Sequence, residues 1–265
     1  LRYQRDIETP FFNHHLKDKG SFPVKEATVF ETGSNEWKSF PQWPPAIIKP
    51  SAFYFHGNGR LNTTAPTARN DSSRYISDPA NPVPYTQSMG WNRNNDYLGE
   101  DQRFLAGRKD VLKFETLPLE KPMELLGPVQ ANLFVTVTGS DADFIVKLID
   151  IYPPSEINPS LSGLQQLVRA EVFRGKFRNS YSKPEAFIPG KTESVRFTLN
   201  DVAHVFKPGH RLMVQVQSSW FPLVDRNPQQ FLNIYEANAS DFIKSTIRIH
   251  HDAQNSSAII LPVLK

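Results

Sequence analysis

In several segments of this chain apolar and polar positions alternate with a period of two, a pattern typical of β-strands with one buried face. In Leu212–Gln217 the alternation places Leu212, Val214 and Val216 on one face. Similar runs predict strands at residues 51–55, 110–116, 130–138, 143–151, 167–178, 193–200, 210–219, 246–250 and 258–264. Several short strands separated by turns predict an all-β sandwich or jelly roll.

Two parts of the chain depart from this pattern. Residues 1–20 have apolar side chains at helical spacing and a glycine, Gly20, after a cationic last turn, which predicts a helix. A short strand at 27–32 and an ordered connector rich in Trp and Pro at 37–50 follow. Residues 62–104 are polar, rich in turns and almost without periodicity, and a stretch of that length is normally functional or disordered.

Composition narrows the function classes. The 265 residues fit one large domain, or one domain and part of another. Cysteine is absent, which excludes disulfides, a thiol nucleophile and a cysteine-ligated metal. The net charge of +3 is spread among acidic residues, so we expect no nucleic-acid partner, and no apolar run is long enough for a membrane helix. The chain opens on Leu without a signal peptide, and we expect a processed or trimmed fragment.

The sequence offers no complete catalytic set. The Gly-x-Ser-x-Gly elbow, the phosphate-binding and dinucleotide-binding loops and the His-Glu-x-x-His motif are all missing, so we expect no catalytic residue, metal or cofactor in this chain. Asp141 and Asp143 could ligate a hard cation, but turn chemistry is the favoured interpretation. Structural roles are also favoured for the histidines, among them His204 and His210, which flank a turn.

Residues 217–229 predict a corner at one end of the sandwich. An alternating strand leads into two apolar anchors, Trp220 and Phe221, and then into a charged turn with Asp225 and Arg226. The Arg226 guanidinium can fix a loop through forked hydrogen bonds. A structural corner is favoured over a binding loop.

The segment 88–97 places Met89, Trp91 and Tyr97 among polar neighbours. Amphipathic aromatic side chains on a loop are typical of recognition surfaces, yet they equally fit a loop packed on its own sandwich. The residues leave these two interpretations open.

Several longer segments resemble one family of serine hydrolases. They are Asp78–Pro84, Gly99–Leu112, Asp143–Asp150, Phe173–Arg178, Pro208–Arg211 and Val214–Pro228. Together they resemble the C-terminal domain of α-amino-acid ester hydrolases, cocaine esterases, glutaryl acylases and X-prolyl dipeptidyl-peptidases, the peptidase S15-like group. The resemblance runs from about Phe11 to Val263.

The resemblance implies a division into two parts. Residues 1–50 would be the last helix, strand and connector of an α/β-hydrolase domain, and residues 51–265 a jelly-roll β-sandwich of galactose-binding-like type. In the family the Ser, Asp and His of the triad lie upstream of this helix. The chain would therefore be a non-catalytic domain, inactive alone, of a serine acyl hydrolase that acts on esters, amides or peptides.

The resemblance also implies a partner and a site. The partner would be the α/β-hydrolase domain of the same protein, with Met89, Trp91 and Tyr97 on the wall of its acyl pocket. A homo-oligomer and a periplasmic or secreted location are further expectations, with a cytoplasmic location left open. The alternative function is a stand-alone carbohydrate- or ligand-binding module in which Trp37, Trp43, Trp91 and Trp220 stack on sugars.

Overall fold

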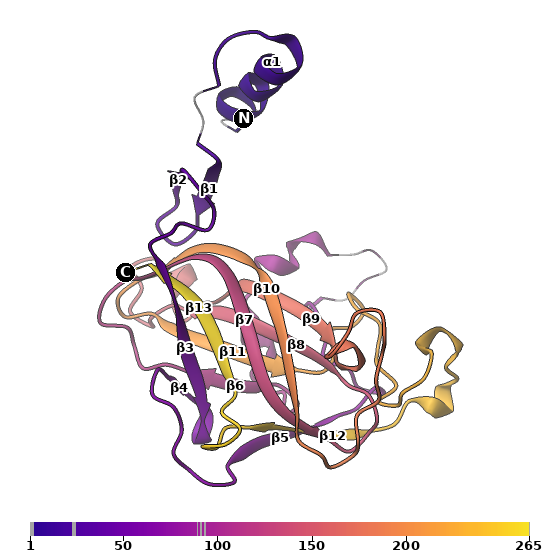
Figure 1. Cartoon of the computed structure of the whole chain (residues 1–265). Coiled ribbons are helices and arrows are strands. Elements are labelled where there is room, and N and C mark those ends of the chain that lie inside the picture. The colour runs from indigo at the N-terminus through magenta and orange to yellow at the C-terminus, as the bar shows by residue number, and fades with distance from the viewer. Residues whose placement is uncertain (1–2, 23–24, 89, 91, 93, 265) are drawn as a thin grey trace.

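The structure is a computed structural model that describes residues 3–22, 25–88, 90, 92 and 94–264 (Figure 1). It confirms the all-β prediction, because one short α-helix accompanies many strands in this part of the chain. The strands are β1 Ala27–Glu31, β2 Glu36–Phe40, β3 Ile48–His56, β4 Arg60–Asn62, β5 Ser72–Ser77, β6 Leu112–Glu115, β7 Met123–Val137, β8 Asp143–Ile151, β9 Gln165–Arg174, β10 Glu193–Phe206, β11 Arg211–Gln217, β12 Ser245–His250 and β13 Ala258–Leu264.

The strands β3–β13 form one curled sheet that folds over itself. One layer has the order β5-β12-β7-β13-β3, with β10 also paired to β7, and the other has the order β6-β11-β8-β9. The short strand β4 joins the layers, since it pairs with β3 and makes one parallel bridge, Arg60 to Glu115, with β6. The main core lies between the layers, where the rings of Phe55 and Phe114 stack at 4.2 Å.

The strand β11 shows how the second layer is covered. Leu212, Val214 and Val216 lie in the core between the layers, as their alternation predicts. The opposite face of β11, with Met213 and Gln215, is also fully buried. Loops cover that outer face, and a second cluster of apolar side chains forms beneath them. In this layer, β6-β11-β8-β9, called the back layer below, the two central strands β11 and β8 are therefore buried on both faces.

The N-terminal segment lies apart from the sandwich (Figure 1). It contains a π-helical turn, η1 Gln4–Glu8, and the helix α1 Thr9–Lys17, which ends where Asp18 adopts a left-handed conformation (φ 48°). The helix prediction is confirmed, although α1 ends before Gly20. No described residue of α1 is buried. The β1–β2 hairpin follows and contacts the sandwich through paired backbone bonds between Thr32 and β10.

Short 3-10 turns connect the remaining strands. They are η2 Gly57–Gly59, η3 Asn95–Leu98, η4 Gln102–Leu105, η5 Pro159–Leu161, η6 Gly175–Phe177, η7 Ile234–Glu236 and η8 Ala239–Asp241. Two of them, η3 and η4, lie in the long stretch 62–104, which also contains β5. The domain boundary at residue 50 falls inside β3, and this boundary and the galactose-binding-like topology stay predictions.

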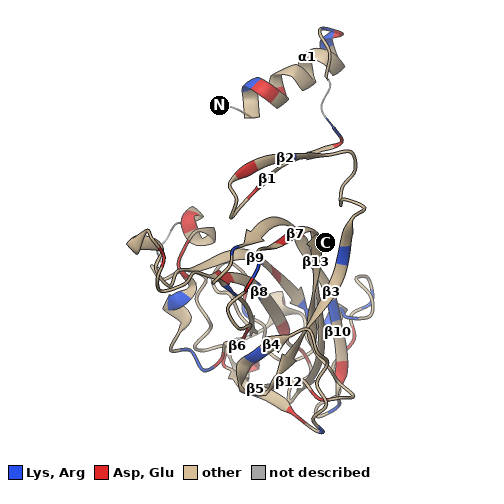
Figure 2. Cartoon of the chain, turned by 90° about the vertical axis from the view of Figure 1, so that its left-hand side faces the viewer, with Lys and Arg blue, Asp and Glu red and all other residues tan. Residues whose placement is uncertain are grey.

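Residues of both charge signs are interspersed along the ribbon (Figure 2). No helix of the described residues is long and apolar enough to cross a membrane.

Candidate functional site

The two candidate regions of the sequence meet in one aromatic cluster. The Tyr97 ring, on η3, packs edge-on against Trp220 at 5.7 Å and against Tyr85 at 5.5 Å. All three side chains are buried, and they lie on the outer face of the back layer. Tyr97 thus attaches the segment 88–97, called the loop below, to the sandwich. Met89 and Trp91 lie outside the described residues.

A buried lysine lies beneath this loop. Lys147, in the middle of β8, has no exposed surface, and its Nζ lies 5.0 Å from the centre of the Trp220 ring. Its hydrogen-bond acceptor is Gln102 Oε1 on η4, at 3.0 Å. Burial lowers the pKa of Lys147 to about 7, with the Glu100 carboxylate acting in the opposite direction. The amine that contacts η4 therefore has a pKa that burial lowers toward neutrality.

Hydrogen bonds close both ends of the loop. Both carboxylate oxygens of Glu100 accept from the backbone N–H of Gln87, at 3.0 and 3.1 Å. The backbone N–H of Asn94 donates to the Tyr85 hydroxyl, and its side-chain amide donates to Thr86 Oγ1. Residues 87 and 94 are thereby fixed, so the segment between them starts and ends at defined positions.

The residues of the predicted corner contact several other segments of the chain. Arg226 donates to the carbonyl of Pro79 at 2.9 Å, and its guanidinium packs on the rings of Phe221 and Phe242. Asp225 accepts from Arg174 at 3.0 Å. The backbone of Phe221 exchanges hydrogen bonds with residues 83 and 85. The corner thus braces both the loop and the end of β9.

A second buried polar cluster lies beside the turn of the β1–β2 hairpin. The Asp150 carboxylate contacts His204 Nε2 at 3.2 Å and His210 Nδ1 at 2.8 Å, and all three side chains are buried. His204 Nδ1 lies 2.7 Å from the Thr32 hydroxyl, which also donates to the carbonyl of Ala203. This chain of contacts links the hairpin to the sandwich, a structural use of both histidines.

The aspartates considered for a cation are engaged in other contacts. Asp143 is paired with Arg174 and accepts from Asn227 Nδ2 at 2.8 Å. Burial raises the pKa of Asp141 to about 6, and the Asp143 carboxylate adds to this effect. The described residues contain no group of three or more potential ligands that could hold a metal ion.

The tryptophans considered for sugar stacking are not arranged as a common platform. Trp220 is buried, and the indole N–H of Trp43 donates to Asp201 at the base of the hairpin. Trp37 lies on β2 and packs edge-on against Phe30. Trp91 lies outside the described residues.

Sequence reasoning missed the polar residues under the loop, Lys147, Gln102 and Gln215. The signal available for Lys147 was a single charge inside the otherwise apolar run Phe144–Ile149. A strand buried on both faces needs a partner for such a charge. Nothing in the sequence indicated that Gln102 would supply the acceptor.

The fold and these contacts define a β-sandwich domain. Its loops pack on the outer face of the back layer, and its N-terminal arm, made of α1 and the β1–β2 hairpin, contacts the sandwich through Thr32. The profile of the X-Pro dipeptidyl-peptidase C-terminal non-catalytic domain matches residues 19–260. The chain belongs to this family.

Several known proteins resemble this chain in sequence and in structure. The chain is 31% identical to the cocaine esterase of Rhodococcus sp. (strain MB1 Bresler), covering 96% of this chain and 45% of that protein. An aminopeptidase structure from a marine sediment archaeon, Thaumarchaeota archaeon, is 39% identical with a TM-score of 0.95, over 100% of this chain and 44% of that one. An α-amino acid ester hydrolase structure is 36% identical with a TM-score of 0.94, over 99% of this chain and 45% of that one. The chain therefore spans a little under half the length of these relatives.

Proposed function

We propose that this chain is the C-terminal, non-catalytic part of a serine acyl hydrolase, of ester, amide or aminopeptidase type. It packs on an α/β-hydrolase domain of the same protein and forms one wall of the acyl pocket. The family and the relatives support the class of enzyme. The parent enzyme would attack a carbonyl with Ser, using His as base and Asp to orient it, through an acyl-enzyme.

The observation that supports packing on a hydrolase domain is the exposed apolar surface of the N-terminal helix α1. Phe11, Phe12 and Leu16 of α1 are 42%, 47% and 72% exposed. A helix normally buries its apolar stripe against another element, because exposed apolar area costs about 25 cal/mol per Å². In Figure 1 the arm extends away from the sandwich, so its apolar side chains are available to a neighbouring domain.

The loop between Gln87 and Asn94 is the proposed pocket wall. Tyr97 and Glu100 fix its base on the sandwich, and rigid support is what a substrate-positioning segment needs. Trp91 and Met89 are the proposed contacts with the acyl group, and Tyr97 is the proposed support at the end of this segment. No observation favours the carbohydrate-binding alternative.

Fluorophosphonate labelling with intact-mass detection tests the enzyme class. We expect the product of the longer reading frame upstream of this chain to react at one serine, and the 265-residue chain alone to stay unlabelled. Labelling of the short chain would contradict the proposal, and so would a long form that does not react.

Substitution in the long form tests the wall. Trp91→Ala should change KM and the preference among acyl groups of different size, while the labelling rate of the serine by a small fluorophosphonate is retained. The matched control is Tyr235→Ala, since Tyr235 is 88% exposed on a different loop, where truncation should leave both quantities unchanged. Equal effects of the two substitutions would contradict a wall at Trp91.

A homo-oligomer and a periplasmic or secreted location are proposed on the resemblance alone. Sedimentation of the long form and fractionation of the cells that produce it test the two points separately.

A further inference from the structure

The strand β5 is an edge of the large sheet. It pairs with β12 and ends the strand order of its layer. The backbone N–H of His251 donates to the carbonyl of Asp71, so the alternation of an antiparallel ladder assigns Ser73, Tyr75 and Ser77 to the bonds with β12. The N–H and C=O groups of Arg74 and Ile76 therefore point away from β12.

These outward groups are free within the described chain. No described residue forms a hydrogen bond with the backbone of Arg74 or Ile76 on that side. Unpaired edge groups are a template for another strand, and proteins usually cover or disrupt them. Here neither a proline nor a bulge interrupts Ser72–Ser77.

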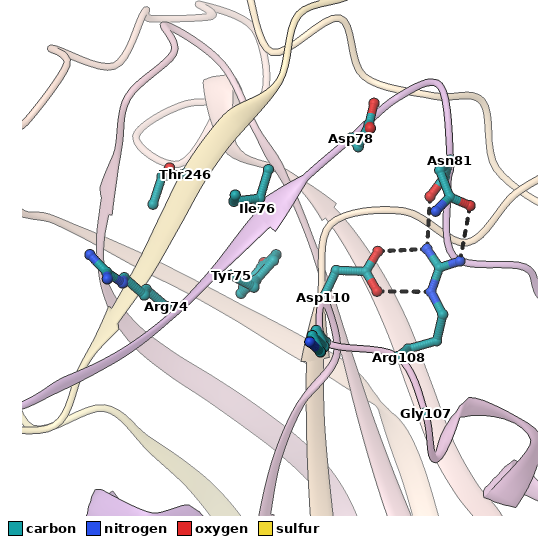
Figure 3. A pocket seen from close by; sticks show the side chains of 10 residues that line it. Arg74, Tyr75, Ile76, Asp78, Asn81, Gly107, Arg108, Asp110 and Thr246 are labelled. Atoms are coloured by element: carbon teal, nitrogen blue, oxygen red, sulfur yellow. Dashed lines mark hydrogen bonds and ion pairs between the residues drawn. The ribbon is translucent and has the colours of Figure 1, made fainter.

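A cleft runs beside this edge. Its volume is about 760 Å³, and its lining includes Arg74, Tyr75 and Ile76 on one side and residues 107–110 on the other (Figure 3). The buried Tyr75 ring forms part of the wall, with its hydroxyl bonded to Ser218, while Ile76 is 58% exposed. The cleft thus offers open backbone groups and an exposed apolar contact to one ligand.

The charges around the cleft favour an anionic occupant. Arg108 forms two bonds with Asp110, at 2.8 and 2.6 Å, and Lys244 pairs with Asp78 at 2.9 Å. These contacts neutralise both carboxylates of the lining. Arg74 and Lys109 have no salt bridge with any described residue.

A third cation, Arg248, adds to the excess of positive charge next to Arg74. Arg248 on β12 is the direct cross-strand partner of Arg74, and the register makes them a non-hydrogen-bonded pair, in which side chains are closest. Like charges placed directly opposite each other destabilise a sheet. A carboxylate between the two guanidinium groups would remove that repulsion.

We propose that the free edge of β5 binds an extended acidic segment of a partner protein, which adds to the sheet as a further strand. Main-chain bonds to Arg74 and Ile76 provide the pairing, and carboxylates at alternate positions of the segment contact Arg74, Arg248 and Lys109. The proposal does not depend on the hydrolase assignment.

Fluorescence polarisation with the 265-residue chain tests the proposal. The probe is a labelled hexapeptide of alternating glutamate and valine, compared with a lysine–valine version and with a version N-methylated at alternate residues. We expect the acidic peptide to bind, and both comparison peptides to bind at least about tenfold more weakly, since one lacks the charge and the other the backbone donors.

Protein variants separate charge from pairing. Arg74→Glu with Lys109→Glu should weaken binding about tenfold or more, whereas the control pair Lys191→Glu with Lys207→Glu, which changes the net charge equally at other turns, should have little effect at about 0.15 M salt. Ile76→Pro removes one outward N–H and leaves the bonds of Tyr75 and Ser77 to β12, so it should abolish binding. A thermal melt verifies that this variant is folded.

Three results would overturn the proposal. The first is binding of a comparison peptide as tight as that of the acidic peptide. For the N-methylated peptide this result indicates adhesion without strand pairing, and for the lysine peptide it indicates binding without selection for negative charge. The second is absence of binding at millimolar peptide. The third is concentration-dependent dimerisation that Ile76→Pro abolishes, which assigns the edge to a second copy of the chain.

Discussion

The two faces of the back layer are equally buried but differ in chemistry. The inner face, between the layers, is dominated by apolar side chains such as Phe114, Leu148 and Val214, with the Asp150 carboxylate at one end of β8. The outer face, beneath the loop, mixes Ile149 and Met213 with polar groups such as Lys147. An apolar core needs only shape and volume, whereas a polar layer needs directed partners. The inner face thus stabilises the sandwich, and the outer face determines where the loop attaches.

The largest expected effect is the loss of an inner-face ring. Phe114→Ala removes a buried ring stacked on Phe55, and we expect the free energy of unfolding to fall by about 3–5 kcal/mol. Denaturant unfolding followed by circular dichroism measures this loss. The control Phe231→Ala truncates a ring that is 42% exposed, so it should change the stability by less than about 0.5 kcal/mol.

On the outer face, removal of a buried charge should have the opposite sign. Lys147→Met replaces the amine by an apolar chain of similar length, and we expect the free energy of unfolding at pH 7 to rise by about 1–4 kcal/mol. The exposed Lys109→Met is the matched control and should be neutral. A loss of stability in Lys147→Met would mean that the bond to Gln102 outweighs the cost of burying the charge.

The pH dependence follows from the lowered pKa of Lys147. Between about pH 7 and pH 10.5 the unfolded chain holds a proton that the folded chain has released, so this group makes stability rise with pH in that window. The stability advantage of Lys147→Met should therefore shrink as the pH rises through the window, and stay constant below it. Urea titrations at several pH values measure the difference between the two proteins.

The sequence predicted the inner face better than the outer one. The period of two in Leu212–Val216 is sufficient to place Leu212, Val214 and Val216 together on one face, in the core. The burial of Gln215 on the other face depends on a loop more than 100 residues away in the chain, and a local pattern carries no information about it.

Among the strands that the sequence pattern missed or shortened, β5 and β7 have identifiable reasons. The strand β5 reads Ser-Ser-Arg-Tyr-Ile-Ser, and as an edge strand it buries only alternate positions, so its polar outer face resembled a loop. The strand predicted at 130–138 corresponds to β7, which begins earlier, at Met123, and passes through Gly127-Pro128, two residue types that usually weaken a strand. The strand continues through them because Gly127 takes a φ of 125°, and β10 pairs along its whole length with one register shift.

A smaller gain in stability is expected at Gln215. Neither atom of its buried side-chain amide has a partner among the described residues. Gln215→Met keeps the length of the side chain and removes this polar group, so we expect the free energy of unfolding to rise by about 1 kcal/mol. The control Gln166→Met removes an amide that accepts from the Tyr152 hydroxyl, and it should lower stability instead.

The smallest expected effect is also the most local one. Tyr97→Leu keeps an apolar side chain but removes the edge-on contacts with Trp220 and Tyr85, which are worth about 1 kcal/mol. Because the inner face is untouched, amide hydrogen exchange should accelerate in residues 94–102 and stay unchanged in β8 and β11. The control Tyr181→Leu removes a ring that is 81% exposed, so it should leave hydrogen exchange unchanged both in residues 94–102 and in β8 and β11. If exchange also accelerated in β8 and β11, the loop would be part of the cooperative core, and the two faces would not be separable.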